Sequence, residues 1–320
     1  MSKAYNTKGK YMLVVCPNPS VDILASVKNF IEGDSNRIVK ESHFPGGKGV
    51  HVALAAAEMG EEVILLGFWG GPTGAWIKQE CQKYSNLTCV GPIVNQWSRS
   101  CYTFSSEGKF NDTELLGVGP VLSENETNAF YECFELLLDE AKCVCMSGSW
   151  PQGAPADGYA RLIGQANAHS KATFLDCTGI QFENAVRSNP FMVHLNKSEA
   201  TAIFKTENVK DAAAKLAKFT TYAAVTDGAK GLYLSKGENF VHASCKIDKV
   251  LSAVGSGDCL TAGIAVGFVR KYDIRKMAKL GAACGSANCM REDLGLLYET
   301  DVENLFRQAT ISEVVLDYSN

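Results

Sequence analysis

The sequence lacks the features of a membrane protein or a nucleic-acid-binding protein. None of its apolar stretches is long enough to span a bilayer, and it contains no run of basic residues. The formal net charge of −4 gives no electrostatic reason to bind nucleic acid or an anionic membrane. The basic segment "MSKAYNTKGK" is followed by "YMLVVC", which is too short for a signal-peptide core. We therefore expect a cytoplasmic protein whose partners are neither nucleic acids nor membranes.

The cysteines also lack a recognisable pattern. The chain has 12 of them, scattered and mostly inside apolar segments, with no C-x-x-C pair and no histidine spacing that suits zinc. The closest two, Cys143 and Cys145, would lie on the same face of a strand, since one residue separates them. We interpret the cysteines as free thiols that act as small core residues in a reducing compartment.

Apolar runs of strand length alternate with helical patterns along nearly the whole chain, without a repeat or a low-complexity linker. This alternation predicts an α/β fold with a mostly parallel sheet that is covered on both faces, formed by one domain over residues 1–320. The expected strands are residues 11–16, 62–68, 142–148, 172–177, 191–195, 222–226 and 231–235, and the expected helices are residues 48–59, 74–84, 125–141, 156–169, 209–220, 257–271 and 275–291.

Two regions interrupt the alternation. Residues 20–44 and 95–118 contain short, polar, alternating segments and no helical pattern. We expect these insertions to pair into a small antiparallel lid over the carboxyl ends of the sheet strands. Ligands of open α/β sheets bind at those ends.

The segment Gly255–Asp258 places a carboxylate directly after a glycine pair where a helix is expected to begin. The dinucleotide-binding fingerprint requires a glycine where Leu260 stands, and the Walker A motif requires Ser or Thr where Gly49 follows Lys48. Neither a Rossmann oxidoreductase nor a P-loop NTPase is supported. Asp258 is then either a plain helix cap or a base beside an anion, because helix N-termini bind phosphates through free amides.

Several motifs occur in a fixed order: "NPSVDI", "GGKGVHVA", "SGSWPQG", "LDCTG" and "AVGSGD". With these motifs the chain resembles, over essentially its whole length, the PfkB (ribokinase-like) family of carbohydrate kinases. The similarity is to the branch that contains 1-phosphofructokinase and tagatose-6-phosphate kinase. The resemblance implies a three-layer α/β/α fold with a mostly parallel central sheet and a small β-sheet lid. It also implies ATP and Mg²⁺ as cofactors, with a monovalent cation as a further candidate.

The resemblance assigns roles to individual residues. Asp258 would be the catalytic base, and the amides of Gly255, Ser256 and Gly257 would form the anion hole for the transferred phosphoryl group. Nucleotide contacts would come from Asn196, Glu199, Thr226, Gly228, Gly231 and Asn288, with Glu199 acting on magnesium through water. Substrate contacts would come from Asp22, Gly46, Gly47, Lys48, His51, Arg99 and, as a weaker candidate, Arg37.

The chain departs from the family pattern mainly on the sugar side. His51 stands where the branch usually has an Asn that bonds a sugar hydroxyl, and Ser98 and Ser100 flank Arg99 where the lid motif usually reads T-R-N. His194 and Leu195 replace the Lys and Pro of the motif that ends at Glu199. His51 could therefore contact substrate or be a satisfied polar group, and Lys48 and the two arginines could be surface charges.

Three functions remain open at this point. The first is phosphorylation of a phosphorylated ketohexose, fructose 1-phosphate or tagatose 6-phosphate, to a bisphosphate. The second is phosphorylation of a non-phosphorylated sugar or a nucleoside, and the third is a non-catalytic sugar-phosphate sensor. The intact Gly-Ser-Gly-Asp segment argues against the sensor, which needs no base. Because lid strands have open edges, we also expect a homodimer that pairs through the lids.

Overall fold

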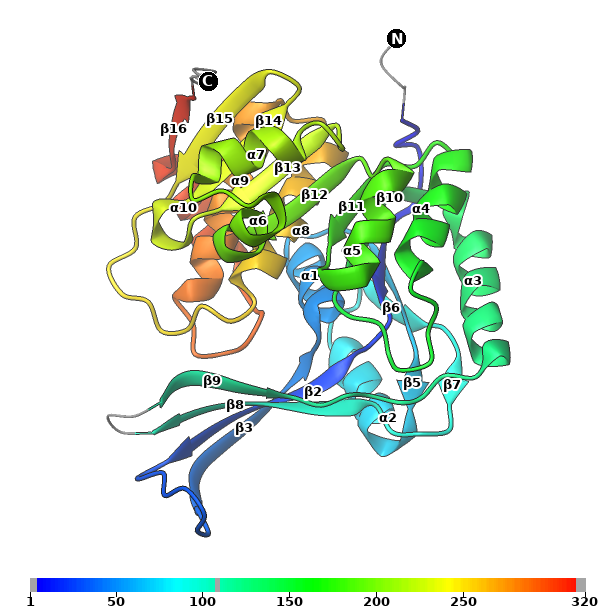
Figure 1. The fold of residues 1–320 in the computed structure, drawn as a ribbon, viewed down its shortest axis with the longest axis vertical. Helices are drawn as coiled ribbons and strands as arrows, with labels where there is room; N and C mark the ends of the chain where they lie inside the picture. Colours follow the sequence, from blue (N-terminus) through cyan, green and yellow to red (C-terminus); the bar gives the residue numbers. More distant parts are fainter. Residues whose placement is uncertain (1–4, 107–109, 315–320) are drawn as a thin grey trace.

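The computed structural model describes residues 5–106 and 110–314, so residues 107–109 of the expected lid insertion lie outside the described residues (Figure 1). The large sheet has the strand order β16-β15-β14-β13-β12-β11-β10-β1-β4-β6. Neighbours from β6 to β13 run parallel, and β14 to β16 extend the sheet antiparallel. Its strands are β1 (Tyr11–Cys16), β4 (Val63–Gly67), β6 (Leu87–Val90), β10 (Ala141–Ser147), β11 (Thr173–Asp176), β12 (Met192–Asn196), β13 (Tyr222–Thr226), β14 (Leu232–Lys236), β15 (Asn239–Ser244) and β16 (Thr310–Glu313).

Helices cover both faces of this sheet, because its central strands are apolar on both sides. In β1, Met12 and Val14 pack into one buried cluster and Leu13 and Val15 into another. The first cluster includes residues of α1 (Lys48–Glu58), α2 (Gly71–Cys81), α8 (Ser256–Val269), α9 (Ile274–Cys289) and α10 (Glu299–Gln308). The second includes residues of α3 (Glu124–Leu138), α4 (Gly158–Ala168), α5 (Gly179–Ala185), α6 (Lys197–Phe204) and α7 (Val209–Leu216). The expected three-layer α/β/α architecture is confirmed.

A second sheet forms the lid and projects from one end of the large sheet (Figure 1). The pairs β2–β3 and β8–β9 are antiparallel, but β2 and β8 run parallel, so the expectation of a fully antiparallel lid is wrong. The reason is that each insertion forms its own hairpin, and both first strands leave the domain in the same direction. The lid strands are β2 (Ser20–Val27), β3 (Ile38–Gly46), β8 (Arg99–Ser106) and β9 (Phe110–Leu116).

The parallel strands bring several segments to one edge of the large sheet. Cys16, Asp176, Asn196 and Thr226 are the last residues of their strands, and these ends lie at the same edge. The lid strand β2 begins four residues after Cys16 and therefore starts from this edge. Short elements complete the chain: β5 (Trp69–Gly70), β7 (Ile93–Val94) and two 3₁₀ turns, Val186–Ser188 and Gly228–Lys230.

Among the described residues, no helix is long and apolar enough to cross a membrane.

The aromatic cluster under α3 provides a test of the core. Phe130 is fully buried and stacks on Phe68 with ring centroids 4.3 Å apart, while Trp150 meets it edge-on. We expect Phe130→Ala to lower the free energy of unfolding by about 3–5 kcal/mol, because a large apolar side chain and its contacts are lost. Urea denaturation measures the change. Leu136→Ala on the same helix is the control, since Leu136 is 85% exposed. Equal stabilities of the two variants would contradict the packing described.

Candidate active site

The start of α8 is shaped by close backbone approach. Gly255 caps the helix with a φ of +83°, and a Cβ on it would lie 2.4 Å from the Cα of Gly295. Amides of a first helical turn have no partner within the helix. The Ser256 amide is one of the amides expected to form the anion hole. In the structure it donates to the carbonyl of Ala253 at 3.2 Å. Asp258 follows on the first turn and is buried, so an ionisable side chain lies directly beside the helix N-terminus.

Asp258 is joined to α1 through His51. The Nδ1 of His51 lies 2.8 Å from Oδ2 of Asp258, and its Nε2 lies 3.4 Å from Oδ2 of Asp22. Burial lowers the pKa of His51, but the two neighbouring carboxylates outweigh it and raise the pKa to about 10. Burial raises the pKa of Asp258 above its ordinary value, while His51 and Lys48 oppose that rise. Burial also favours a higher pKa for Asp22, but the effect of His51 is larger and the pKa of Asp22 is lowered.

A second ionic group lies next to the first. The Nζ of Lys48 lies 2.7 Å from Oδ1 of Asp176, and Nδ1 of His194 lies 2.7 Å from Oδ2 of the same carboxylate. Burial opposes ionisation of Asp176, but the charges of Lys48 and His194 hold its pKa well below the usual range. The Nε2 of His194 is 3.3 Å from Oγ1 of Thr226, which extends the group to the end of β13.

Sequence reasoning did not assign roles to Asp176 and His194. Asp176 lies in "LDCTG" at the end of β11, and His194 lies in "HLNKSEA" near the end of β12. Both segments were recognised as motifs, and both were expected to end parallel strands. Their place at the carboxyl edge of the sheet was the signal that could have identified them.

The glycines before α1 allow Asp22 to approach the main chain. A Cβ on Gly46 would lie 2.0 Å from Cγ of Asp22, and Gly47 has a φ of +95° that lets the chain turn into the helix. The hydroxyl of Ser20 donates to Oδ1 of Asp22 at 2.6 Å. The structure thus places Asp22 next to the segment Gly46–Lys48.

The two arginines occupy different places. Arg99 begins β8, is half-buried, and donates to the carbonyls of Asn18 at 3.1 Å and Gly117 at 3.2 Å. It pairs in register with Ser20, two residues from Asp22. Arg37 is exposed and precedes β3, whereas Gly46 ends that nine-residue strand. The two ends of such a strand are about 30 Å apart. Within one chain, the structure does not bring Arg37 to the other site residues.

The residues expected at the nucleotide lie along β12 to β14 and on α9. Asn196 and Glu199 form a capping box at α6: Oδ1 of Asn196 accepts from the Glu199 amide at 3.0 Å, and Oε2 of Glu199 accepts from the Asn196 amide at 2.9 Å. Gly228 and Gly231 both have positive φ in the turn after Thr226. Asn288 is fully buried and donates to the carbonyl of Leu296, next to Gly295.

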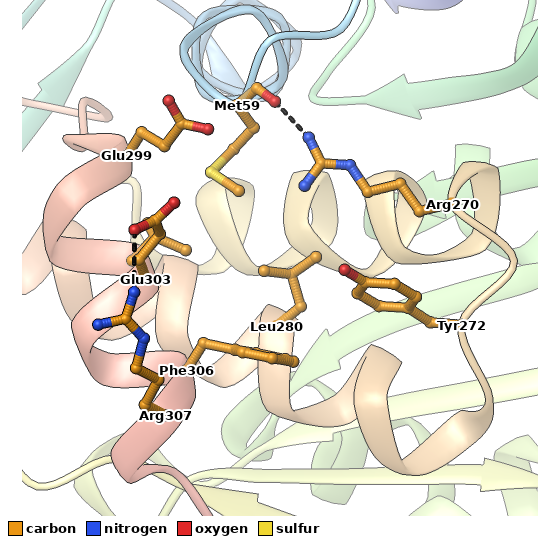
Figure 2. A pocket seen from close by; sticks show the side chains of 9 residues that line it. Met59, Arg270, Tyr272, Leu280, Glu299, Glu303, Phe306 and Arg307 are labelled. Carbon is orange, nitrogen blue, oxygen red and sulfur yellow. Dashed lines mark hydrogen bonds and ion pairs between the residues drawn. The ribbon is translucent and has the colours of Figure 1, made fainter.

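A cavity of about 240 Å³ lies away from this cluster (Figure 2). It is lined by residues that include Met59 and Arg270, which cap the C-terminal ends of α1 and α8, and by Phe306 of α10. Figure 2 shows Arg270 donating to the carbonyl of Met59 beside the other lining residues. Lys48 and Asp258 lie at the opposite, N-terminal ends of the same two helices. The cavity therefore belongs to the packing of α10 rather than to the ionic cluster.

No group of three or more His, Cys, Asp or Glu residues that could hold a metal ion occurs within residues 5–106 and 110–314. The carboxylate of Glu199 is nevertheless fixed at the carboxyl edge of the sheet by its capping hydrogen bond. Its charge also helps to raise the pKa of Lys48, after the larger effects of burial, which lowers it, and of Asp176 and Asp258. Mg²⁺ usually keeps several waters and binds substrate phosphates, so such a single carboxylate fits an ion held through water.

Known proteins match this chain in sequence pattern and in fold. Residues 16–301 match the model of the pfkB family carbohydrate kinases. The fold is similar to that of phosphofructokinase-2 from Escherichia coli in complex with substrates and products, with a TM-score of 0.85, 22% identity, and coverage of 93% of this chain and 98% of that one.

Two further solved structures share the fold. A possible 1-phosphofructokinase from Thermotoga maritima gives a TM-score of 0.83 at 22% identity, with coverage of 95% of this chain and 99% of that one. Arabidopsis thaliana ribokinase complexed with ribose and ATP gives a TM-score of 0.73 at 17% identity, with coverage of 93% of this chain and 99% of that one. By the family match over most of its length, the chain belongs to the pfkB family of carbohydrate kinases.

Proposed function

We propose that the protein transfers the γ-phosphoryl group of ATP to a hydroxyl of a phosphorylated ketohexose. The substrate is fructose 1-phosphate or tagatose 6-phosphate, and the product is a bisphosphate. The observation that carries this proposal is the buried Asp258 on the first turn of α8, which is hydrogen-bonded to His51 and influenced by the charge of Lys48. A carboxylate at a helix N-terminus, surrounded by cations, suits transfer of a negatively charged group to an alcohol.

In this mechanism Asp258 takes the proton of the acceptor hydroxyl. The hydroxyl oxygen forms a bond to the γ-phosphorus as the bond from that phosphorus to the ADP oxygen breaks, and the proton moves to the carboxylate. A carboxylate is a weak base for an alcohol, so the proton moves only as the new bond forms. The raised pKa that burial gives Asp258 makes it a stronger base than an exposed aspartate.

The N-terminus of α8 stabilises the transferred phosphoryl group. Gly255 and Gly257 supply amides there, and Ser256 contributes once its amide leaves the carbonyl of Ala253. The nucleotide lies along Thr226, Gly228 and Gly231, with support from Asn196 and Asn288. Glu199 would hold Mg²⁺ through water, and that ion supplies neutralisation of phosphate charge when bound. Activation by a monovalent cation stays a prediction.

The sugar lies between the lid and α1. Asp22 accepts hydrogen bonds from sugar hydroxyls, and the main chain at Gly46 and Gly47 allows close approach. Lys48 and Arg99 interact with negatively charged groups of the substrates. Arg99 contacts the phosphate already on the sugar, because its guanidinium group can bond two phosphate oxygens. Arg37 reaches a sugar only if the lid of a second copy brings it there.

A second acceptor is favoured by one observation. Arg99 already donates to the carbonyls of Asn18 and Gly117, so part of its hydrogen-bonding capacity is committed within the chain. A non-phosphorylated sugar or a nucleoside would not require the remaining hydrogen-bond donors of Arg99. The sensor hypothesis has less support, because a binding protein gains nothing from a buried base at a helix N-terminus.

Asp258→Asn tests the assigned base. We expect turnover to fall at least about 100-fold, because the amide cannot accept the hydroxyl proton, while ATP binding measured by calorimetry stays largely intact. ATP consumption across a panel of ketose phosphates gives the rates. Asp248→Asn, a change in an exposed loop carboxylate, should leave them unchanged. Turnover above a tenth of the parent rate in Asp258→Asn would remove Asp258 from the mechanism.

Arg99→Ala separates the two acceptor classes. For a phosphosugar kinase we expect KM for the sugar phosphate to rise about 10- to 100-fold, because a charged hydrogen bond pair is lost. The matched control is Arg187→Ala, at an exposed site in the 3₁₀ turn after α5. The opposite result is a parent enzyme whose KM is lower for a neutral sugar than for any sugar phosphate, with that KM unchanged in Arg99→Ala. The acceptor is then a non-phosphorylated sugar.

The lid offers a surface for self-association. Val39 is 67% exposed, and the cross-strand neighbours Tyr102 and Leu115 are 38% and 58% exposed. We propose a homodimer in which these apolar residues of two lids meet. Sedimentation should give a dimer mass for the parent protein, and Leu115→Glu should shift it to the monomer. A parent protein that is monomeric at micromolar concentration would contradict this.

A further inference from the structure

His51 is buried between two carboxylates that come from different parts of the fold. The ring lies on α1, and its side chain is 4% exposed. Asp258 on α8 lies at its Nδ1 at 2.8 Å, and Asp22 on the lid strand β2 lies at its Nε2 at 3.4 Å. No hydrogen bond is formed by Nε2 within the described residues, so the Asp22 contact is an ion pair. His51 thus connects the expected base with the expected sugar-binding carboxylate.

The geometry sets the protonation state of the ring. A neutral imidazole carries one N–H, so one of its nitrogens would present a lone pair to a carboxylate oxygen. Only the imidazolium directs an N–H to both Asp258 and Asp22. The raised pKa of His51 agrees with this argument, because both carboxylates favour the charged form.

The ring is also held in place by backbone on another side. A Cβ on Gly295 would lie 2.1 Å from Cγ and Cδ2 of His51, and a Cβ on Gly255 would lie 3.4 Å from Nδ1. Gly295 has a φ of +69°, and its neighbour Leu296 is anchored by Asn288. These close approaches leave little room for the ring to rotate away from Asp258.

Resting on the proposed role of Asp258, we propose that His51 is a positioning residue: as an imidazolium it holds Asp258 ionised and occupies its Oδ2. The other oxygen, Oδ1, is then left to accept the hydroxyl proton. The Asn that usually occupies this position in the family carries no charge and cannot do this. His51 acts on the sugar side through Asp22 rather than by a contact of its own.

The charge of His51 changes the net charge that faces the phosphates. The neighbouring ionised groups are Asp22 on β2, Asp176 on β11, Asp258 on α8 and Lys48 on α1, with Glu199 on α6 acting on Lys48. His194 lies beside Asp176 as well. Whatever the total charge of these groups, the imidazolium makes it one unit more positive than a neutral ring does. Phosphate groups enter such a site more readily when the ring is charged.

Two substitutions test the proposal. His51→Asn restores the usual family residue, and His51→Gln keeps a longer amide that still donates to Asp258, but both lack the charge. Without the charge of His51, Lys48 alone opposes the effect of burial, so the pKa of Asp258 rises further and its ionised fraction falls. We expect the acidic limb of the profile of kcat against pH to move to higher pH by at least about one unit. At any pH on that limb, kcat then falls about tenfold, while KM for ATP stays unchanged.

The control is a second histidine in a similar setting. His169 also lies between two carboxylates, with Nε2 2.8 Å from Glu135 and Nδ1 2.9 Å from Asp139, but on the surface far from the cluster. His169→Gln should leave the profile in place. If both His51 variants keep the parent acidic limb, or change only KM for the sugar, the inference is wrong. If Asp258→Asn retains turnover instead, the proposed function has failed and not this inference alone.

A measurement on the unmodified protein covers variants that fail to fold. Nitrogen-15 NMR of the histidine rings distinguishes imidazolium from neutral tautomers. We expect the signal of one doubly protonated ring to persist at pH 8. This signal should be absent from the spectra of the His51 variants. If those variants do not fold, the signal is assigned to His51 through its contact with Gly295. A neutral ring for His51 at pH 8 would overturn the proposal.

Discussion

The hydrogen bond between His51 and Asp258 ties α1 to α8 at the point where the chemistry is expected. Burying an ionised carboxylate costs several kcal/mol, and a partner of opposite charge offsets that cost only at close range. Asp258 and Asp22 share His51, and Asp176 has Lys48 and His194. Because every buried carboxylate of this cluster depends on a cation from another element, loss of one member leaves another uncompensated.

The fold supplies these partners by simple geometry. Parallel strands end at one edge, and the helices that follow β3 and β15 begin there, so α1 and α8 present their N-termini to the same space. Glycines let these backbones approach: Gly46 faces Asp22, and Gly255 faces Gly295. The site is therefore assembled from segments that are far apart in sequence, each held by the sheet rather than by its neighbours in the chain.

Periodicity predicted the large elements well, because buried parallel strands and amphipathic helices leave strong patterns. The strand at 222–226 was located to the residue, whereas α6 and α10 were not expected, since short helices with few buried positions give weak signals. Motif positions predicted Asp258 and Asp22 as site residues. Their link through His51 could not be predicted, because nothing in the local sequence relates residue 51 to residue 258, and only the packing of α1 on α8 makes them neighbours.

Asp22 belongs to the lid strand, while His51 and Asp258 belong to the body of the domain. The contact between Asp22 and His51 therefore joins the lid to the body of the domain. A lid that swings outward carries one carboxylate away from the imidazolium and weakens its hold on the positive charge, and a lid that closes restores it. The proton affinity of the ring and, through it, that of the base would thus depend on the position of the lid.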